Sequence, residues 1–71
     1  MLLTEFLTKS LEESGLTKYR LAKITKILEP DIGRYLSGSR HPKFKSVVIM
    51  LRGMGVSDEK TLKFIKQYKN Y

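Results

Sequence analysis

The residues best placed to do chemistry lie on one face of a predicted helix over residues 29–37. The outer face of that helix consists of Glu29, Pro30, Gly33, Arg34 and Ser37. Arg34 carries a planar fork of donors that can grip a guanine edge, a contact worth roughly 1 to 3 kcal/mol of discrimination between bases. The alternative for Arg34 is a phosphate contact or a solvated side chain. Glu29 can accept a hydrogen bond from a cytosine amino group, or it can stabilise the helix start.

The sequence contains no comparable set of residues that would indicate catalysis. The sequence contains one histidine, His41, and no cysteine. It has no carboxylate pair spaced for acid–base work, no glycine-rich phosphate loop and no cluster of metal ligands. His41 precedes Pro42 and is expected to be an exposed loop residue. The sequence therefore predicts no enzyme, and neither a metal, a cofactor nor a small-molecule substrate.

The basic charge of the chain is concentrated in its middle. The formal net charge is +7, and residues 17–45 contribute +6 through eight bases and two acids. Residues 1–16 carry −2 and residues 46–71 carry +3. Small soluble domains often carry such a charge for solubility alone. Its placement favours a polyanionic partner.

Length and composition predict one small domain over residues 1–71. The lack of cysteine excludes a disulfide framework and a thiolate zinc site, and it suits a reducing compartment. No apolar run approaches the roughly 18 residues of a membrane span. The first residues lack the order of a secretion signal. The expectation is a soluble, cytoplasmic protein without a membrane partner.

Apolar residues recur at helical spacing in five segments, and none shows the alternation of a strand. The expected helices run from about residue 2 to 14, from a Thr17 cap to a turn at 26–28, over 29–37, over about 44–54, and from Ser57 onward. Their expected inward-facing positions are Leu3, Phe6, Leu7, Leu11, Leu21, Ala22, Thr25, Ile32, Tyr35, Leu36, Val47, Val48, Leu51, Met54, Leu62, Ile65 and Tyr68. The predicted fold is all-α, a compact bundle of five short helices in which the second and third form a helix-turn-helix.

The segment from Gly15 to Pro42, 28 of the 71 residues, resembles a known family. The resemblance is carried by Leu21-Ala22, by Ile32 ten residues after Ala22, and by the exit YLSGSRHP that ends at Pro42. This pattern is similar to the lambda-repressor-like, Xre-type helix-turn-helix domains of phage repressors and Cro-type regulators. The resemblance implies sequence-specific binding of double-stranded operator DNA by the third helix, commonly as a homodimer on paired half-sites. A Cro-like transcriptional repressor of phage or mobile-element origin is expected.

The resemblance also implies which residues contact phosphates. They lie at the start of the second helix and in the loop after the third, and they are Thr17, Lys18, Tyr19, Ser39, Arg40 and Lys43. Such contacts position a protein on the duplex without reading its sequence.

Several residues depart from the family pattern. Lys26 stands where glycine is usual, so either it adopts a left-handed conformation or the turn differs. Leu28 replaces a capping serine or asparagine and leaves the third helix without a side-chain cap. Gly33 weakens a short helix, yet it lets backbone approach DNA closely. Glu29 and Asp31 oppose phosphates, and Asp31 has no assigned role.

A second aromatic stripe, formed by Phe64, Tyr68 and Tyr71, lies beside the expected inward stripe of the fifth helix. It can serve as a dimer interface. The alternative is that these rings cover the bundle.

Two other functions stay open at this point. A protein-binding module of the same fold, such as an antitoxin or adaptor, is favoured by Leu28, Pro30 and the two acids of the third helix. Binding of structured RNA is a further alternative, although the sequence offers no aromatic platform on a sheet.

Overall fold

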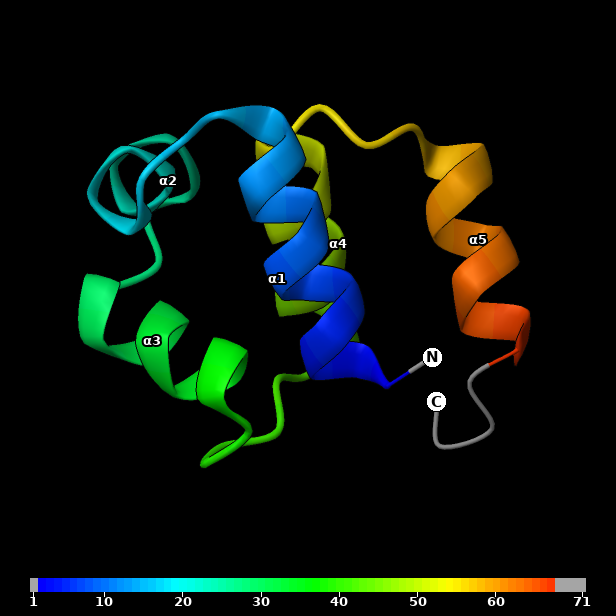
Figure 1. Cartoon of the computed structure of the whole chain (residues 1–71), viewed down its shortest axis with the longest axis horizontal. Helices are drawn as coiled ribbons and strands as arrows, with labels where there is room; N and C mark the ends of the chain where they lie inside the picture. The colour runs from blue at the N-terminus through cyan, green and yellow to red at the C-terminus, as the bar shows by residue number, and fades with distance from the viewer. Residues whose placement is uncertain (1, 68–71) are drawn as a thin grey trace.

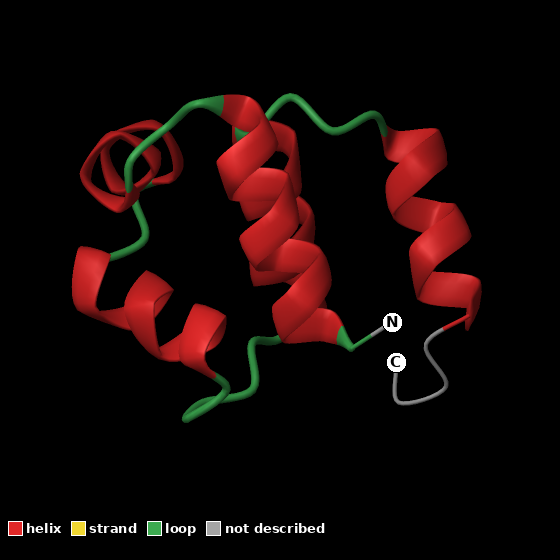
Figure 2. Cartoon of the chain, viewed as in Figure 1, coloured by secondary structure: helices red, strands yellow, loops and turns green. Residues whose placement is uncertain are grey.

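Five α-helices follow one another along residues 2–67, the part of the chain that the computed structural model describes (Figure 1). They are α1 (Leu3–Ser14), α2 (Lys18–Thr25), α3 (Glu29–Ser37), α4 (Phe44–Gly53) and α5 (Asp58–Gln67). Only loops and turns connect them, and the described residues contain no strand (Figure 2). The predicted all-α class is confirmed, and the predicted helix boundaries, which did not include the end of α5, agree with the observed ones to within one residue.

Local signals in the sequence set several helix ends. Gly15 follows α1 with φ +74°, a left-handed conformation that glycine adopts without strain. The Thr17 hydroxyl accepts a hydrogen bond from the N–H of Arg20 at 3.1 Å, so the predicted cap of α2 is confirmed. Before α5, the Ser57 hydroxyl accepts from the N–H of Lys60 at 3.1 Å.

The helices enclose one hydrophobic core. In Figure 1, α1 and α4 occupy the middle of the molecule, with α2 and α3 to one side and α5 to the other. Contacts join α2 to α3 and α4, α1 to α3, and α4 to α5. The buried hydrophobic side chains are Leu3, Phe6, Leu7, Leu11, Leu21, Ile32, Tyr35, Val47, Met50, Leu51, Met54 and Phe64. Most were expected at inward positions, whereas Met50 and Phe64 were not.

The helices α2 and α4 approach closely at Gly53. A β-carbon there would lie 2.9 Å from Thr25 Cγ2 and 3.1 Å from Leu21 Cδ1, which is too close without a shift. Thr25 is held further because its hydroxyl donates to the Leu21 carbonyl at 2.7 Å. The missing side chain of Gly53 therefore lets α2 rest directly on α4.

The inward face of α5 differs from the expected one. Thr61 and Phe64 are buried, whereas Leu62 is 53% exposed and Ile65 is half-buried. The ring of Phe64 stacks on that of Phe6 in α1, with 4.1 Å between centroids and 5° between planes. This stack sets the rotation of the helix about its axis, because it buries the largest side chain that α5 can direct at the bundle.

The stack also decides the role of Phe64. This residue was a candidate for a dimer interface, and the structure instead places its ring in the core of the single chain, 7% exposed. Covering the bundle, the alternative that the sequence left open, is the correct interpretation for Phe64. The other two members of the proposed stripe, Tyr68 and Tyr71, lie outside the described residues.

Lys26 takes the left-handed conformation that its position in the turn requires. Its φ is +66°, and its N–H donates to the Ala22 carbonyl at 2.9 Å, closing α2. Among residues 2–67, Lys26 is the one non-glycine residue with a positive φ. The turn thus keeps the backbone geometry that a glycine would supply, with a lysine that is strained in it.

Replacement Lys26→Gly is expected to raise the free energy of unfolding by roughly 0.5 to 1 kcal/mol, because relief of the left-handed strain exceeds the extra chain entropy of unfolded glycine. Urea denaturation followed by circular dichroism measures the change. The matched control is Lys23→Gly, inside α2 with ordinary helical geometry, which is expected to lower stability by about 1 kcal/mol. If Lys26→Gly were less stable than the wild type, the inferred backbone strain at Lys26 would be contradicted.

Candidate functional site

The exposed side of α3 separates cleanly from its buried side. Ile32 is fully buried, Tyr35 is 9% exposed and Leu36 is half-buried against the core, as expected. The residues predicted on the outer face lie at the surface, with Gly33 partly covered and the other four exposed, namely Glu29, Pro30, Arg34 and Ser37. The helix therefore presents to solvent a side on which Glu29, Arg34 and Ser37 carry the polar groups.

The start of α3 is organised without a side-chain cap. Leu28 occupies the N-cap position in an extended conformation, and no side-chain hydrogen bond caps the helix, as predicted. Its carbonyl accepts from the N–H of Ile32 at 3.1 Å, while its side chain is 69% exposed. Pro30 lies in the first turn with a preset φ, and the acids Glu29 and Asp31 of the same turn lie near the positive end of the helix dipole.

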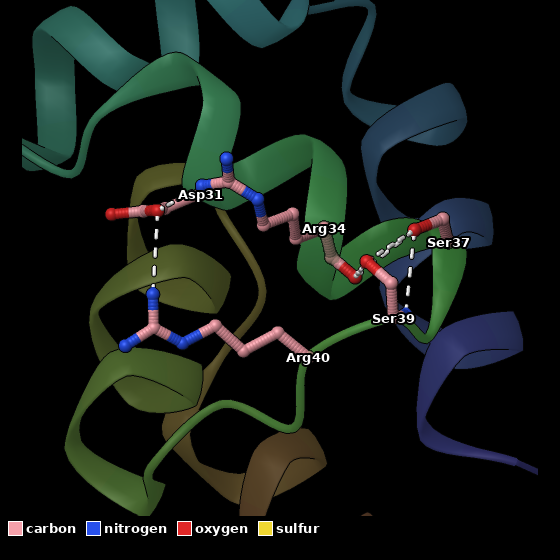
Figure 3. Close-up of polar contacts among 5 residues, drawn as sticks. All are labelled: Asp31, Arg34, Ser37, Ser39 and Arg40. Carbon is pink, nitrogen blue, oxygen red and sulfur yellow. Dashed lines mark hydrogen bonds and ion pairs between the residues drawn. The ribbon is translucent and has the colours of Figure 1, made fainter.

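Asp31 brings two arginines together beside α3. Arg34 Nη1 donates to Asp31 Oδ1 at 2.9 Å, and Arg40 Nη1 lies 3.5 Å from the same oxygen (Figure 3). The side chains of Arg34 and Arg40 are 55% and 59% exposed, and that of Asp31 is 25% exposed. The structure thus links the predicted base-reading arginine with a predicted phosphate-contacting arginine through a residue to which the sequence assigned no role.

The loop after α3 folds back onto the end of the helix. The Arg34 carbonyl accepts from the Ser37 hydroxyl at 3.1 Å, from the Ser39 hydroxyl at 3.4 Å and from the Arg40 N–H at 3.3 Å. Gly38 permits this course with φ +83°. Carbonyls at a helix end lack partners within the helix, and here the loop supplies them (Figure 3). The hydroxyls of Ser37 and Ser39 therefore stabilise the folded conformation of the loop.

The predicted phosphate-contacting residues at the start of α2 are exposed. Thr17 caps the helix, and Lys18 projects from its first turn. Tyr19 is 54% exposed, with the Lys23 ammonium 4.8 Å from its ring centroid. Tyr19 and Glu29 line one shallow depression between α2 and the start of α3. The structure thus brings together a residue predicted to contact phosphates and one predicted to read bases.

Lys43 remains separate from these groups. It is the exposed N-cap of α4, in an extended conformation, and no side-chain hydrogen bond caps that helix. No described contact joins it to Asp31, Arg34 and Arg40, which together form the Asp31 cluster. Its predicted role as a phosphate contact stays a prediction.

A second surface lies between α4 and α5, away from the Asp31 cluster. Its groove is lined by Phe44, Val48, Arg52, Asp58, Thr61, Leu62 and Ile65. At one end Arg52 donates to both carboxylate oxygens of Asp58, at 3.0 and 3.1 Å. These hydrogen bonds and the charge of Arg52 hold the pKa of the exposed Asp58 below its ordinary value.

Within residues 2–67, no group of three or more histidine, cysteine, aspartate or glutamate side chains is arranged to hold a metal ion. None of the helices in this range combines the length and apolar character needed to cross a membrane. No model of a protein family matches the sequence, and comparisons with curated proteins and with solved structures give no significant match.

Proposed function

We propose that this protein binds double-stranded DNA with sequence selectivity and acts as a Cro-like transcriptional repressor. In this proposal α2, the turn at 26–28 and α3 form a helix-turn-helix, and the outer face of α3 enters the major groove. The observation that carries the proposal is the exposed side of α3, where Arg34 is supported by Asp31 beside a basic loop. A B-DNA major groove about 12 Å wide admits one helix, and each base pair there has a distinct pattern of donors and acceptors.

The distribution of charge supports the same partner. Eight bases against two acids lie between residues 17 and 45, the stretch that contains α2, α3 and the exit loop. In the proposal, Lys18 and Arg40 contact phosphates on either side of the groove. Neutralised phosphates release counterions, so binding should weaken steeply as salt is raised. The two acids of α3 limit this non-selective part of the affinity.

Selection of bound sequences from a random duplex library at about 150 mM salt tests the proposal, because this ionic strength suppresses association through phosphates alone. We expect an enriched motif. An inverted repeat with half-sites about one helical turn apart would support a homodimer on the operator. Folded protein that enriches no motif would contradict the proposal.

Replacement Gly33→Ala should separate stability from binding. The β-carbon of an alanine would meet nothing within 4 Å, so the helix should gain up to about 1 kcal/mol of stability. If DNA lies against this backbone, the methyl group should nevertheless weaken binding to the selected duplex. Thermal unfolding and fluorescence anisotropy measure the two effects. Unchanged or tighter binding would place the closest approach of DNA elsewhere on α3.

A protein-binding module of the same fold is the second candidate. The groove between α4 and α5 favours it, because Phe44 and Leu62 on its walls are 46% and 53% exposed. Under this alternative, binding to DNA would be weak and salt-sensitive and would show no choice of sequence. The library selection therefore distinguishes the two candidates.

A further inference from the structure

Asp31 lies where α3 and its exit loop meet, and both neighbouring guanidinium groups approach the same carboxylate oxygen, Oδ1. We propose that Asp31 is a positioning residue that holds Arg34 and Arg40 in one arrangement on the DNA-facing surface. An acid that lowers the affinity for any polyanion thereby raises selectivity for one sequence. This inference rests on the proposed binding of DNA and names a residue that supports its specificity by positioning Arg34 and Arg40.

The two arginines reach Asp31 from different parts of the chain. Arg34 is three residues further along α3, a spacing that puts both side chains on one face. Arg40 belongs to the loop, and its N–H is bonded to the Arg34 carbonyl at 3.3 Å. From that anchored backbone, its side chain runs back to Asp31, as Figure 3 shows. The arrangement thus depends on the folded loop as well as on the helix.

Each guanidinium group keeps donors for a ligand. Arg34 and Arg40 both use a single nitrogen, Nη1, toward Asp31. An arginine has five N–H donors in a fixed fork, so the remaining donors can bind a guanine edge or a phosphate oxygen. When Arg34 contacts a base and Arg40 contacts a phosphate, Asp31 fixes the position of one arginine relative to the other. The base that is read is thereby set relative to the DNA strand that is bound.

Positioning of this kind acts on binding more than on folding. Ion pairs between exposed side chains add little to stability, because water and salt screen them. A long flexible side chain, however, loses rotamer freedom when it binds. A carboxylate that already restrains the side chain in the free protein reduces this entropic cost of binding. Asp31 also repels phosphates whatever the sequence. Its removal should therefore tighten non-selective binding and loosen selective binding.

The test compares Asp31→Asn with the wild type on the selected duplex and on a scrambled duplex, by fluorescence anisotropy from about 50 to 200 mM salt. We expect Asp31→Asn to bind the scrambled duplex more tightly. Its ratio of selected to scrambled affinity should fall by roughly tenfold, within the range of one bidentate base contact. Asp31→Glu, which keeps the charge, should restore part of the ratio.

The matched control is Asp58→Asn, which removes the same charge and breaks another exposed pair with an arginine, in the first turn of α5. It should raise both affinities by similar factors and leave the ratio unchanged. An equal rise on both duplexes in Asp31→Asn would overturn the inference alone and leave Asp31 as a repelling charge. A wild-type protein with no preference would overturn the proposed function as well.

An NMR measurement tests the positioning without DNA. Relaxation of the Nε–Hε groups should show Arg34 and Arg40 more restrained in the wild type than in Asp31→Asn. Equal mobility in the two proteins would overturn the inference even if the affinities changed.

Discussion

Replacing Phe64 by alanine is expected to lower the free energy of unfolding by about 3 to 5 kcal/mol, the range found when a buried phenylalanine is truncated. Phe64 and Phe6 are 7% and 8% exposed, and their rings stack face to face at 4.1 Å. Truncation would remove the stack and leave a cavity between α1 and α5. A domain of this size has a total stability of only about 4 to 10 kcal/mol. The loss is therefore about a third or more of the total stability, and at the lower end of that range Phe64→Ala would be unfolded at room temperature.

Urea denaturation followed by circular dichroism measures this effect, and Leu62→Ala is its matched control in the same helix. Leu62 is 53% exposed, so its truncation should reduce stability by less than about 1 kcal/mol. If the two variants lost equal stability, the observed rotation of α5 would be contradicted. The inward stripe expected from the sequence would then be the better description.

Replacing Arg34 by alanine is expected to reduce discrimination between the selected and scrambled duplexes by roughly 5- to 150-fold, which corresponds to about 1 to 3 kcal/mol for one bidentate base contact. The side chain is 55% exposed and pairs with Asp31, so its loss should leave the fold intact. Arg34→Lys keeps the charge but not the planar fork, and it should lose most of the same discrimination.

Lys18→Ala provides the contrast, since Lys18 is predicted to contact a phosphate. It should weaken binding to every duplex alike and reduce the slope of log affinity against log salt by about 1. Anisotropy titrations over a series of salt concentrations give both quantities. Equal losses on all sequences in Arg34→Ala and Lys18→Ala would remove Arg34 from the role of base reader.

The sequence predicted the helices well because their ends carry local signals. The Thr17 cap and the acids with Pro30 at the start of α3 act within a few residues, so no tertiary information is needed to recognise them. The predicted inward face of α5 was wrong because that face depends on a contact with another helix. Leu62 with Ile65 and Thr61 with Phe64 both have helical spacing, and only the position of Phe6 in α1 decides between them.

The candidate site was predictable in part. The pairing of Asp31 with Arg34 follows from a spacing of three residues in a helix and can be read from the sequence. The approach of Arg40 depends on the path of the loop, which is set by the left-handed Gly38 and by hydrogen bonds to the Arg34 carbonyl. Such a path is a tertiary property. DNA binding and dimer formation remain predictions that the proposed measurements test.

Gly53 lies outside the exposed side of α3, yet its close contact with α2 affects how α2 and α3 are positioned. Because Gly53 has no side chain, the side chains of Leu21 and Thr25 in α2 pack against the backbone of α4, and α3 packs in turn on α2 and on α1. A methyl group added at Gly53 would press on Thr25 and Leu21, and a shift of α2 would act on its contacts with α3. A substitution at Gly53 can in this way change the position of α3 while every exposed side chain of α3 stays the same.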